Sequence, residues 1–253
     1  MKWFVACLLF FTWQAHSARV ISTSPAITEM ISLLGHEKDI VAVTPYCQDA
    51  TDRPKIGSAL ELDYEKVLAL KPDIIFLQEN TLGKVSKDLT RLKQNFVSLR
   101  IESLTEIFNA WRVIASELKA DPKVISNFEQ DISKTKTPRR VLIVVGAQSG
   151  KSVMIAGKKT FYADLIEQMG HEYASSSLGW PEIDAETMRA LATKPLIIIH
   201  LAINQERLWS EKQWQNFCPK CVVKSYVSPR TTFPGPSVIK NLSTIMRGLD
   251  DRP

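Results

Sequence analysis

The chain has 253 residues, 45% of them hydrophobic and 23% charged, which is an ordinary globular composition and excludes a largely disordered protein. The formal net charge of +5 is mild and spread along the chain, whereas nucleic-acid binding usually needs a dense basic stripe. We therefore expect no nucleic acid among its partners.

The first 18 residues have the pattern of a secretory signal peptide. Lys2 supplies a positive charge, an uncharged run follows from Trp3 to Trp13, and small residues ending at Ala18 suit cleavage. The run is too short to span a bilayer, which needs about 20 apolar residues. Cys7 lies inside the run without the small-residue setting of a lipoprotein cleavage site. We expect a soluble protein that is exported to the periplasm.

Strands and helices are predicted to alternate from residue 19 to residue 102. The strands fall near 19–23, 40–43, 74–77 and 96–101, and the helices near 26–34, 63–70 and 82–93. Such alternation is typical of a parallel sheet with helices on both faces. These residues are therefore predicted to form an N-terminal lobe.

The alternation stops between residues 103 and 137. Two helical patterns, 104–118 and 123–133, follow each other without a strand, which predicts a helical linker. From 138 to 253, strands return near 139–145, 153–156, 196–201 and 222–226, with helices near 161–169, 209–217 and 236–249. The prediction is an α/β fold of two Rossmann-like lobes with central parallel sheets, joined by a long backbone helix, with a ligand groove between the lobes.

An imperfect internal sequence repeat also indicates two lobes. Residues 62–75 (LDYEKVLALKPDII) return more loosely as residues 183–198 (IDAETMRALATKPLII). Each copy has an Asp suited to cap a helix and, two residues later, a Glu in the first turn. The helix dipole would explain either Glu alone. Because both lobes carry the acid at the same place, we predict that Glu65 and Glu186 dock a partner.

Side chains that suit a ligand groove follow several predicted strands. Parallel α/β sheets bind ligands at the carboxyl ends of their strands, where loop aromatics suit the walls of a cleft. The candidates are Tyr46, Cys47, Gln78, Trp180 and His200, and a purely structural role for His200 remains open.

Catalytic signatures are missing from the sequence. It has no GxSxG or HExxH motif and no closely spaced pair of His and acid, so we expect neither an enzyme nor a metal site. An exported α/β enzyme that uses His200 is kept as the alternative from a different functional class.

Cys218 and Cys221 form a CxxC pair. In an oxidising compartment this pair is most simply a disulfide. A redox role would need the first Cys at a helix N-terminus, and zinc would need two further ligands, but a strand-like segment follows and no second CxxC or HxxxH is present. We expect the disulfide and keep the redox pair and the zinc site as alternatives.

Four segments near the start of the chain carry a family resemblance. They are 19–29 (RVISTSPAITE), 41–47 (VAVTPYC), 55–57 (KIG) and 68–73 (LALKPD), and the likeness continues more thinly through Trp180-Pro181, Glu186 and 234–237 (PGPS). Together they resemble the vitamin B12-binding protein family of ABC importers. That family is part of the helical-backbone group of periplasmic binding proteins, which also takes up iron–siderophore complexes and haem.

The resemblance implies a monomeric binding protein without a cofactor of its own, which holds a corrinoid between its lobes and delivers it to an ABC permease. Glu65 and Glu186 match the acids that pair with permease arginines in that family. Tyr46 and Trp180 match aromatics that line the corrinoid groove.

Several departures from the family concern the ligand. The stretch 57–63 lacks the tryptophan found in the best-known cobalamin binders, and Gln78 replaces another aromatic. Phe233 falls where an Arg is expected, although Arg230 could reach the same space, and Met154 is expected to form an apolar wall. Because the resemblance is to vitamin B12-binding proteins, a corrinoid is still the leading candidate for the ligand.

A ferric siderophore or haem stays open as the ligand. For haem, the candidate axial ligands are Tyr46, Cys47 and His200.

Overall fold

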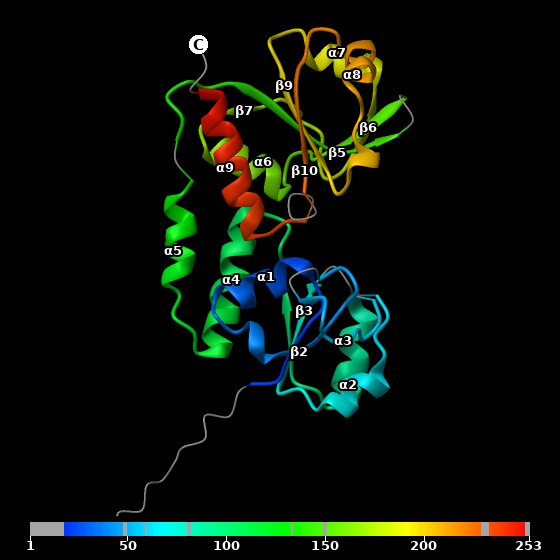
Figure 1. The fold of residues 1–253 in the computed structure, drawn as a ribbon, viewed down its shortest axis with the longest axis vertical. Helices are drawn as coiled ribbons and strands as arrows, with labels where there is room; N and C mark the ends of the chain where they lie inside the picture. The colour runs from blue at the N-terminus through cyan, green and yellow to red at the C-terminus, as the bar shows by residue number, and fades with distance from the viewer. Residues whose placement is uncertain are drawn as a thin grey trace, which may run out of the picture.

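The computed structural model describes residues 18–47, 50–58, 60–79, 82–132, 134–148, 151–228 and 233–250. Two α/β lobes are stacked along the long axis and are joined along one side by helices (Figure 1). The expected signal peptide lies outside the described residues apart from Ala18. No helix in the described ranges is long and apolar enough to cross a membrane.

A four-stranded parallel sheet with the order β2-β1-β3-β4 forms the first lobe. Its elements are β1 (Val20–Ser22), α1 (Pro25–Leu33), the 3-10 turn η1 (Glu37–Asp39), β2 (Ile40–Val43), α2 (Tyr64–Leu70), β3 (Ile74–Gln78), α3 (Leu82–Arg91) and β4 (Phe96–Leu99). Val20 and Phe76 pack in one core with α1. Ile21 and Ile75, on the other face, pack in a second core with α2 and α3. The aliphatic strands are therefore buried on both faces, as in other helix-covered parallel sheets.

The second lobe is built on a six-stranded sheet with the order β10-β9-β5-β6-β8, and β7 pairs with β5 beside this path. The strands are β5 (Arg140–Gln148), β6 (Ser152–Ile155), β7 (Glu172–Tyr173), β8 (Glu182–Asp184), β9 (Ile197–Ala202) and β10 (Val222–Val227). The predicted parallel sheet is confirmed for β10, β9, β5 and β7. In addition, β6 and β8 run antiparallel to their neighbours, so the sheet is mixed.

Four helices and a short turn complete the second lobe. They are α6 (Phe161–Gln168), α7 (Ala185–Leu191), the 3-10 turn η4 (Gln205–Arg207), α8 (Glu211–Phe217) and α9 (Pro236–Asp250). Thr160, Asp184 and Ser210 cap α6, α7 and α8, because each side chain accepts a hydrogen bond from the backbone N–H three residues later. These short polar residues fix where the helices begin.

Two consecutive helices, α4 (Leu104–Leu118) and α5 (Lys123–Gln130), connect the lobes. Ser103 and Glu106 form a capping box at the start of α4. The apolar stripe of α4 is buried, and the Nε1 of Trp111 donates a 3.1 Å hydrogen bond to the backbone oxygen of Met30 in α1. Helix α9 packs against α1 and α5, so the last helix also lies along the junction (Figure 1).

Two helix starts tie the lobes to each other. Asp164 in α6 accepts a 3.2 Å hydrogen bond from the backbone N–H of Leu104, the first residue of α4. Glu29 in α1 accepts a 2.7 Å hydrogen bond from the backbone N–H of Ser237 in α9, and another from the Ser237 hydroxyl. Gly235 permits this approach, because a Cβ there would lie 3.0 Å from Glu29 Oε2. Both carboxylates satisfy N–H groups that a helix leaves unpaired and face the positive end of its dipole.

Candidate functional site

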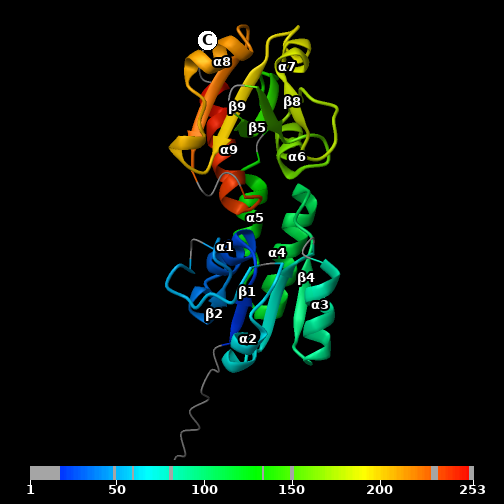
Figure 2. The same ribbon diagram turned by 90° about the vertical axis from the view of Figure 1, so that its right-hand side faces the viewer.

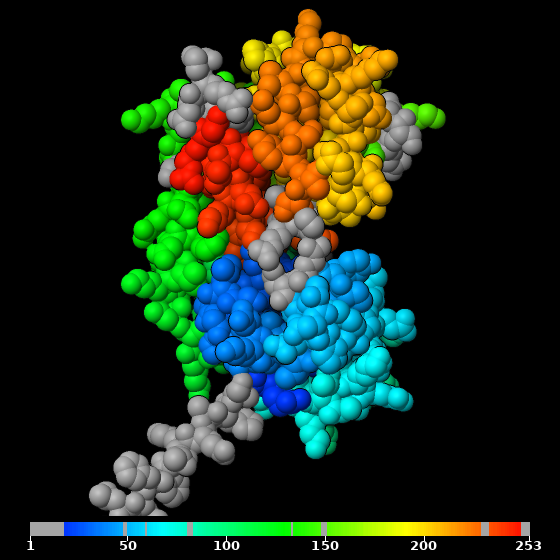
Figure 3. Space-filling model, in the orientation of Figure 1, coloured from blue at the N-terminus to red at the C-terminus, as the bar shows by residue number. Residues whose placement is uncertain are grey.

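A groove separates the two lobes. The strands of the first sheet end on the side that faces the second lobe, where α1 begins, and β10 runs down to the same region (Figure 1). The surface is hollowed between the lobes (Figure 3). At the ends of β3 and β4 lies a cavity of about 270 Å³, lined by Gln78, Glu79, Leu99, Arg100, Ile101 and Glu102. This edge is where parallel α/β sheets present residues to ligands.

Tyr46 is an exposed aromatic residue of the first lobe, in the turn after β2. A hydrogen bond of 3.2 Å from the backbone N–H of Cys47 to the oxygen of Thr44 closes a turn after β2. The turn buries the Cys47 side chain, whose Sγ lies 3.4 Å from Thr44 Oγ1, and leaves the Tyr46 side chain 66% exposed. Gln78, at the end of β3, is half-buried.

Trp180 is an exposed aromatic residue of the second lobe, in the loop before β8. Its side chain is 47% exposed, and its ring packs edge-on against Tyr162 of α6, with the ring centroids 5.9 Å apart. Tyr162 is fully buried, so its fixed ring holds one edge of the Trp180 side chain in place. Met154 on β6 is also exposed.

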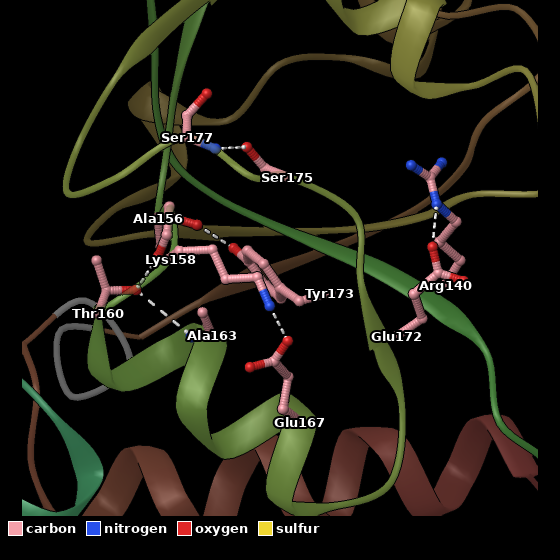
Figure 4. A network of polar contacts seen from close by, with 11 residues as sticks. Arg140, Ala156, Lys158, Thr160, Ala163, Glu167, Glu172, Tyr173, Ser175 and Ser177 are labelled. Carbon is pink, nitrogen blue, oxygen red and sulfur yellow. Dashed lines mark hydrogen bonds and ion pairs between the residues drawn. The ribbon is translucent and has the colours of Figure 1, made fainter.

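The loop that carries Trp180 is held by backbone hydrogen bonds to the turn at residues 157–160, which lies beside Tyr173 and Ser177 in Figure 4. The backbone N–H of Lys158 donates to Ser177 O at 2.6 Å, and that of Gly157 donates to Gly179 O at 2.7 Å. The Tyr173 hydroxyl donates to the oxygen of Ala156 in the same turn. Gly157 is required there, since a Cβ would lie 2.3 Å from Ser177 O.

This network reaches the first lobe directly. The backbone N–H of Phe161, which follows the turn at residues 157–160, donates a 2.6 Å hydrogen bond to the oxygen of Glu102. Glu102 lines the cavity at the ends of β3 and β4. The Trp180 loop is therefore linked to the first lobe in two steps. It is hydrogen-bonded to the turn at residues 157–160, and Phe161 after that turn is hydrogen-bonded to Glu102.

Charged groups surround the cavity in the first lobe. The Nε of Arg100 lies 3.4 Å from a carboxylate oxygen of Glu79 and 3.1 Å from one of Glu106. The lining itself holds two acids, Glu79 and Glu102, and one guanidinium, that of Arg100, so the cavity wall is net acidic.

His200 and Cys47 are core residues in this structure. Both side chains are fully buried. The ring of His200 packs edge-on against Trp214 of α8, 5.3 Å between centroids, and neither ring nitrogen has a hydrogen-bond partner among the described residues. Burial lowers the pKa of His200 to about 4, so the ring is neutral near neutral pH. Neither side chain is exposed to the groove in this structure, contrary to expectation, and their contact with a ligand or with haem stays a prediction.

The other expected ligand residues are only partly described. Phe233 is half-buried and lies three residues before α9. Arg230 lies outside the described residues. Two exposed side chains that sequence reasoning missed are Leu60, in the loop before α2, and Leu178, in the Trp180 loop.

Glu65 and Glu186 occupy equivalent places on the two lobes. Both are exposed in the first turn of a helix, α2 or α7. In each case the preceding Asp, Asp63 or Asp184, caps the helix by accepting from the backbone N–H three residues later, at 3.1 and 2.8 Å. Hydrogen bonds from Lys66 and from Thr187, respectively, lower the pKa of these two carboxyls. Both helices lie on the side of the molecule that Figure 2 shows from the front.

Cys218 and Cys221 are joined by a disulfide with an S–S distance of 2.00 Å. The bond links the end of α8 to the start of β10. Of the three alternatives weighed for this pair, the structure contains the disulfide.

Comparisons with known proteins agree with this geometry. A family model described as periplasmic binding protein matches residues 20–217. A vitamin B12-binding protein from Pectobacterium atrosepticum is 24% identical over 233 residues, which cover 84% of this chain and 82% of that protein.

Solved structures share the fold. The periplasmic haem-binding protein HutB of Vibrio cholerae superposes with a TM-score of 0.73 at 18% identity, covering 91% of this chain and 99% of that one. The periplasmic vitamin B12-binding protein BtuF of Vibrio cholerae gives a TM-score of 0.68 at 16% identity, covering 93% and 99%. Because the family model spans well over half of the chain, the protein belongs to the periplasmic binding protein family.

Proposed function

We propose that the protein is the exported substrate-binding component of an ABC importer, and that it captures a corrinoid between its lobes and delivers it to a membrane permease. The observation that carries the proposal is the pair of exposed aromatic side chains, Tyr46 on one lobe and Trp180 on the other. Aromatic walls with a few polar groups suit a broad, largely flat ligand. The vitamin B12-binding relative supports a corrinoid.

The ligand is bound without covalent chemistry in this proposal. His200, the only residue considered for catalysis, is buried and has no acid or nucleophile bonded to its ring among the described residues. The role of Gln78, beside the cavity at the end of β3, is to offer an amide to polar groups of the ligand.

Isothermal titration of the purified protein with cyanocobalamin tests the corrinoid assignment. We expect binding with a dissociation constant in or below the micromolar range. Trp180→Ala and Tyr46→Ala should each weaken binding roughly tenfold or more, since each removes an aromatic contact worth about 1.5 kcal/mol or more. Val113→Ala, which truncates an exposed apolar side chain of α4, is the matched control and should bind like the wild type. Absence of both heat and thermal stabilisation would exclude the corrinoid.

Haem is the second candidate, because the haem-binding protein HutB shares the fold and Tyr46 is exposed. Of the three candidate axial ligands, Tyr46 alone presents its side chain at the surface. If haem is the ligand, mixing should shift its Soret band in the wild type, and Tyr46→Phe should abolish the shift. An unchanged spectrum in the wild type removes this candidate.

We propose further that Glu65 and Glu186 dock the permease, one from each lobe. Two like charges on one side of the molecule are suited to a pair of basic sites on a partner. Glu65→Arg combined with Glu186→Arg should leave ligand affinity within about twofold and abolish uptake in cells that contain the permease. The matched control is Glu117→Arg, an exposed acid of α4. Normal uptake by the double variant would show that neither acid is needed for docking and that each only stabilises the start of its helix.

A further inference from the structure

A second cavity lies in the second lobe at the edge opposite the groove, where β5, β9 and β10 begin. Its volume is about 600 Å³. Five basic side chains and one acid line it, and the remaining lining residues are prolines and aliphatic side chains. It is therefore a basic cavity with an apolar floor.

The single acid of this cavity is already neutralised. Glu172 accepts a 2.8 Å hydrogen bond from Nε of Arg140 (Figure 4). The remaining guanidinium nitrogens of Arg140 donate to the backbone oxygens of Leu191 and Ala174. Arg140 and Glu172 thus form a closed structural unit, and neither contributes a free charge to the cavity.

Arg139, the second arginine of the lining, also has an interaction partner and is not counted as free charge. The uncompensated charge comes from three lysines, Lys194, Lys220 and Lys224. In the described part of the chain, none of their ammonium groups forms an ion pair or a hydrogen bond with a protein group. The cavity therefore holds three positive charges that no protein carboxylate offsets. Like charges that converge on one cavity repel one another, and an anion between them relieves that repulsion.

Helix-end lysines are common because they face the negative end of the helix dipole. Lys194 and Lys220 each lie three residues beyond the end of a helix, α7 or α8, and so outside the last turn where this effect acts. Lys224 lies inside the strand β10, so the helix dipole accounts for none of the three lysines.

The register of the sheet explains the apolar floor. Val222 of β10 pairs with Ile197 of β9, so these two side chains and Lys224, two residues further along β10, lie on one face. Val222 begins the edge strand β10 and is 53% exposed, so its side chain is open to the cavity. An apolar surface beside three ammonium groups matches a ligand with both characters.

We propose that this cavity binds an anion that has a phosphate head and an apolar body. Lysine ammonium groups bind phosphate as point charges. The cavity is much larger than inorganic phosphate and has the size of small-molecule sites. Membrane phospholipids and soluble phosphate amphiphiles share this chemistry. The site is independent of the ligand in the groove, so it stands or falls separately from the proposed transport function.

Titration of the full chain with dihexanoyl phosphatidic acid, kept below its micellar concentration, tests the proposal. The wild type should bind it, and more tightly than inorganic phosphate, because inorganic phosphate cannot use the apolar floor. The triple variant Lys194→Gln, Lys220→Gln, Lys224→Gln should bind at least about tenfold more weakly. The control variant Lys38→Gln, Lys84→Gln, Lys87→Gln loses the same charge from exposed positions of the first lobe and should bind like the wild type.

Sedimentation with phosphatidylcholine vesicles, with and without phosphatidic acid, distinguishes the two sources of the ligand. Wild-type cosedimentation that needs phosphatidic acid and is lost in the triple variant assigns the site to membrane lipid. Binding of the short-chain lipid without cosedimentation assigns it to a soluble amphiphile. Failure of the wild type to bind the short-chain lipid overturns the proposal, as does equal binding by the triple variant with an unchanged unfolding transition.

Discussion

Replacing the buried His200 with leucine should make the stability of the protein less sensitive to acid. Burial lowers the pKa of His200 from 6.5 to about 4. Between these pH values the unfolded chain takes up a proton at this residue and the folded chain does not. Stability therefore falls as the pH falls from about 6.5 to about 4, and it is unaffected by this residue above that window. Each pKa unit corresponds to about 1.4 kcal/mol, so the full effect is about 3 kcal/mol.

Urea unfolding followed by circular dichroism, repeated at several pH values across the window, measures this effect. The wild type should lose about 3 kcal/mol more unfolding free energy on acidification than His200→Leu does. Near neutral pH the two should lie within about 1.5 kcal/mol, because leucine loses the edge-on contact with Trp214 but leaves no unpaired ring nitrogen.

His36→Gln is the control for this experiment. His36 is a partly exposed histidine that pairs with Asp39 in the first lobe, and its replacement should leave the difference attributed to His200 in place. Identical acid sensitivity of the wild type and His200→Leu would refute the reasoning. A loss of ligand affinity in His200→Leu, at unchanged stability, would show that His200 contributes to ligand binding.

Two further predictions concern the contacts that hold the groove. Glu29→Ala removes the carboxylate that caps α9 and should cost about 2 kcal/mol, or roughly 4–8 °C in thermal midpoint, whereas Glu117→Ala should cost little. An equal change in both variants would show that Glu29 is not a cap. Gly157→Ala should lower the thermal midpoint and weaken ligand binding, because its Cβ would clash with Ser177 O in the network under Trp180. Gly83→Ala, in α3 with open space around it, should instead raise stability by up to about 1 kcal/mol, and matching effects at the two glycines would contradict the argument.

The architecture was predictable because its signals are local. The apolar stripe of residues 104–118 predicts α4 with the bounds that the structure has. The alternating strand and helix patterns likewise predict the parallel strands of both sheets. Strands β7 and β8 were missed because they have two and three residues, which is too short to show a period of two.

The placement of the site residues depends on contacts that the sequence does not display. His200 lies near the end of β9, as expected, but its ring is buried against Trp214 of α8. The aromatic residues Trp214 and Phe217 on α8 were a usable signal that this helix covers that face. The contact between Glu29 and Ser237 joins residues 208 positions apart, and no local pattern announces such a cap.

The identity of the ligand tests the account most directly. The protein can be purified without denaturation from the periplasmic fraction of its native host, and the ligand that copurifies with it identified by mass spectrometry. The account predicts a cobalt-containing corrinoid that is lost from the Trp180→Ala variant and retained by Val113→Ala. Recovery of haem or of a ferric siderophore in its place would contradict the corrinoid assignment.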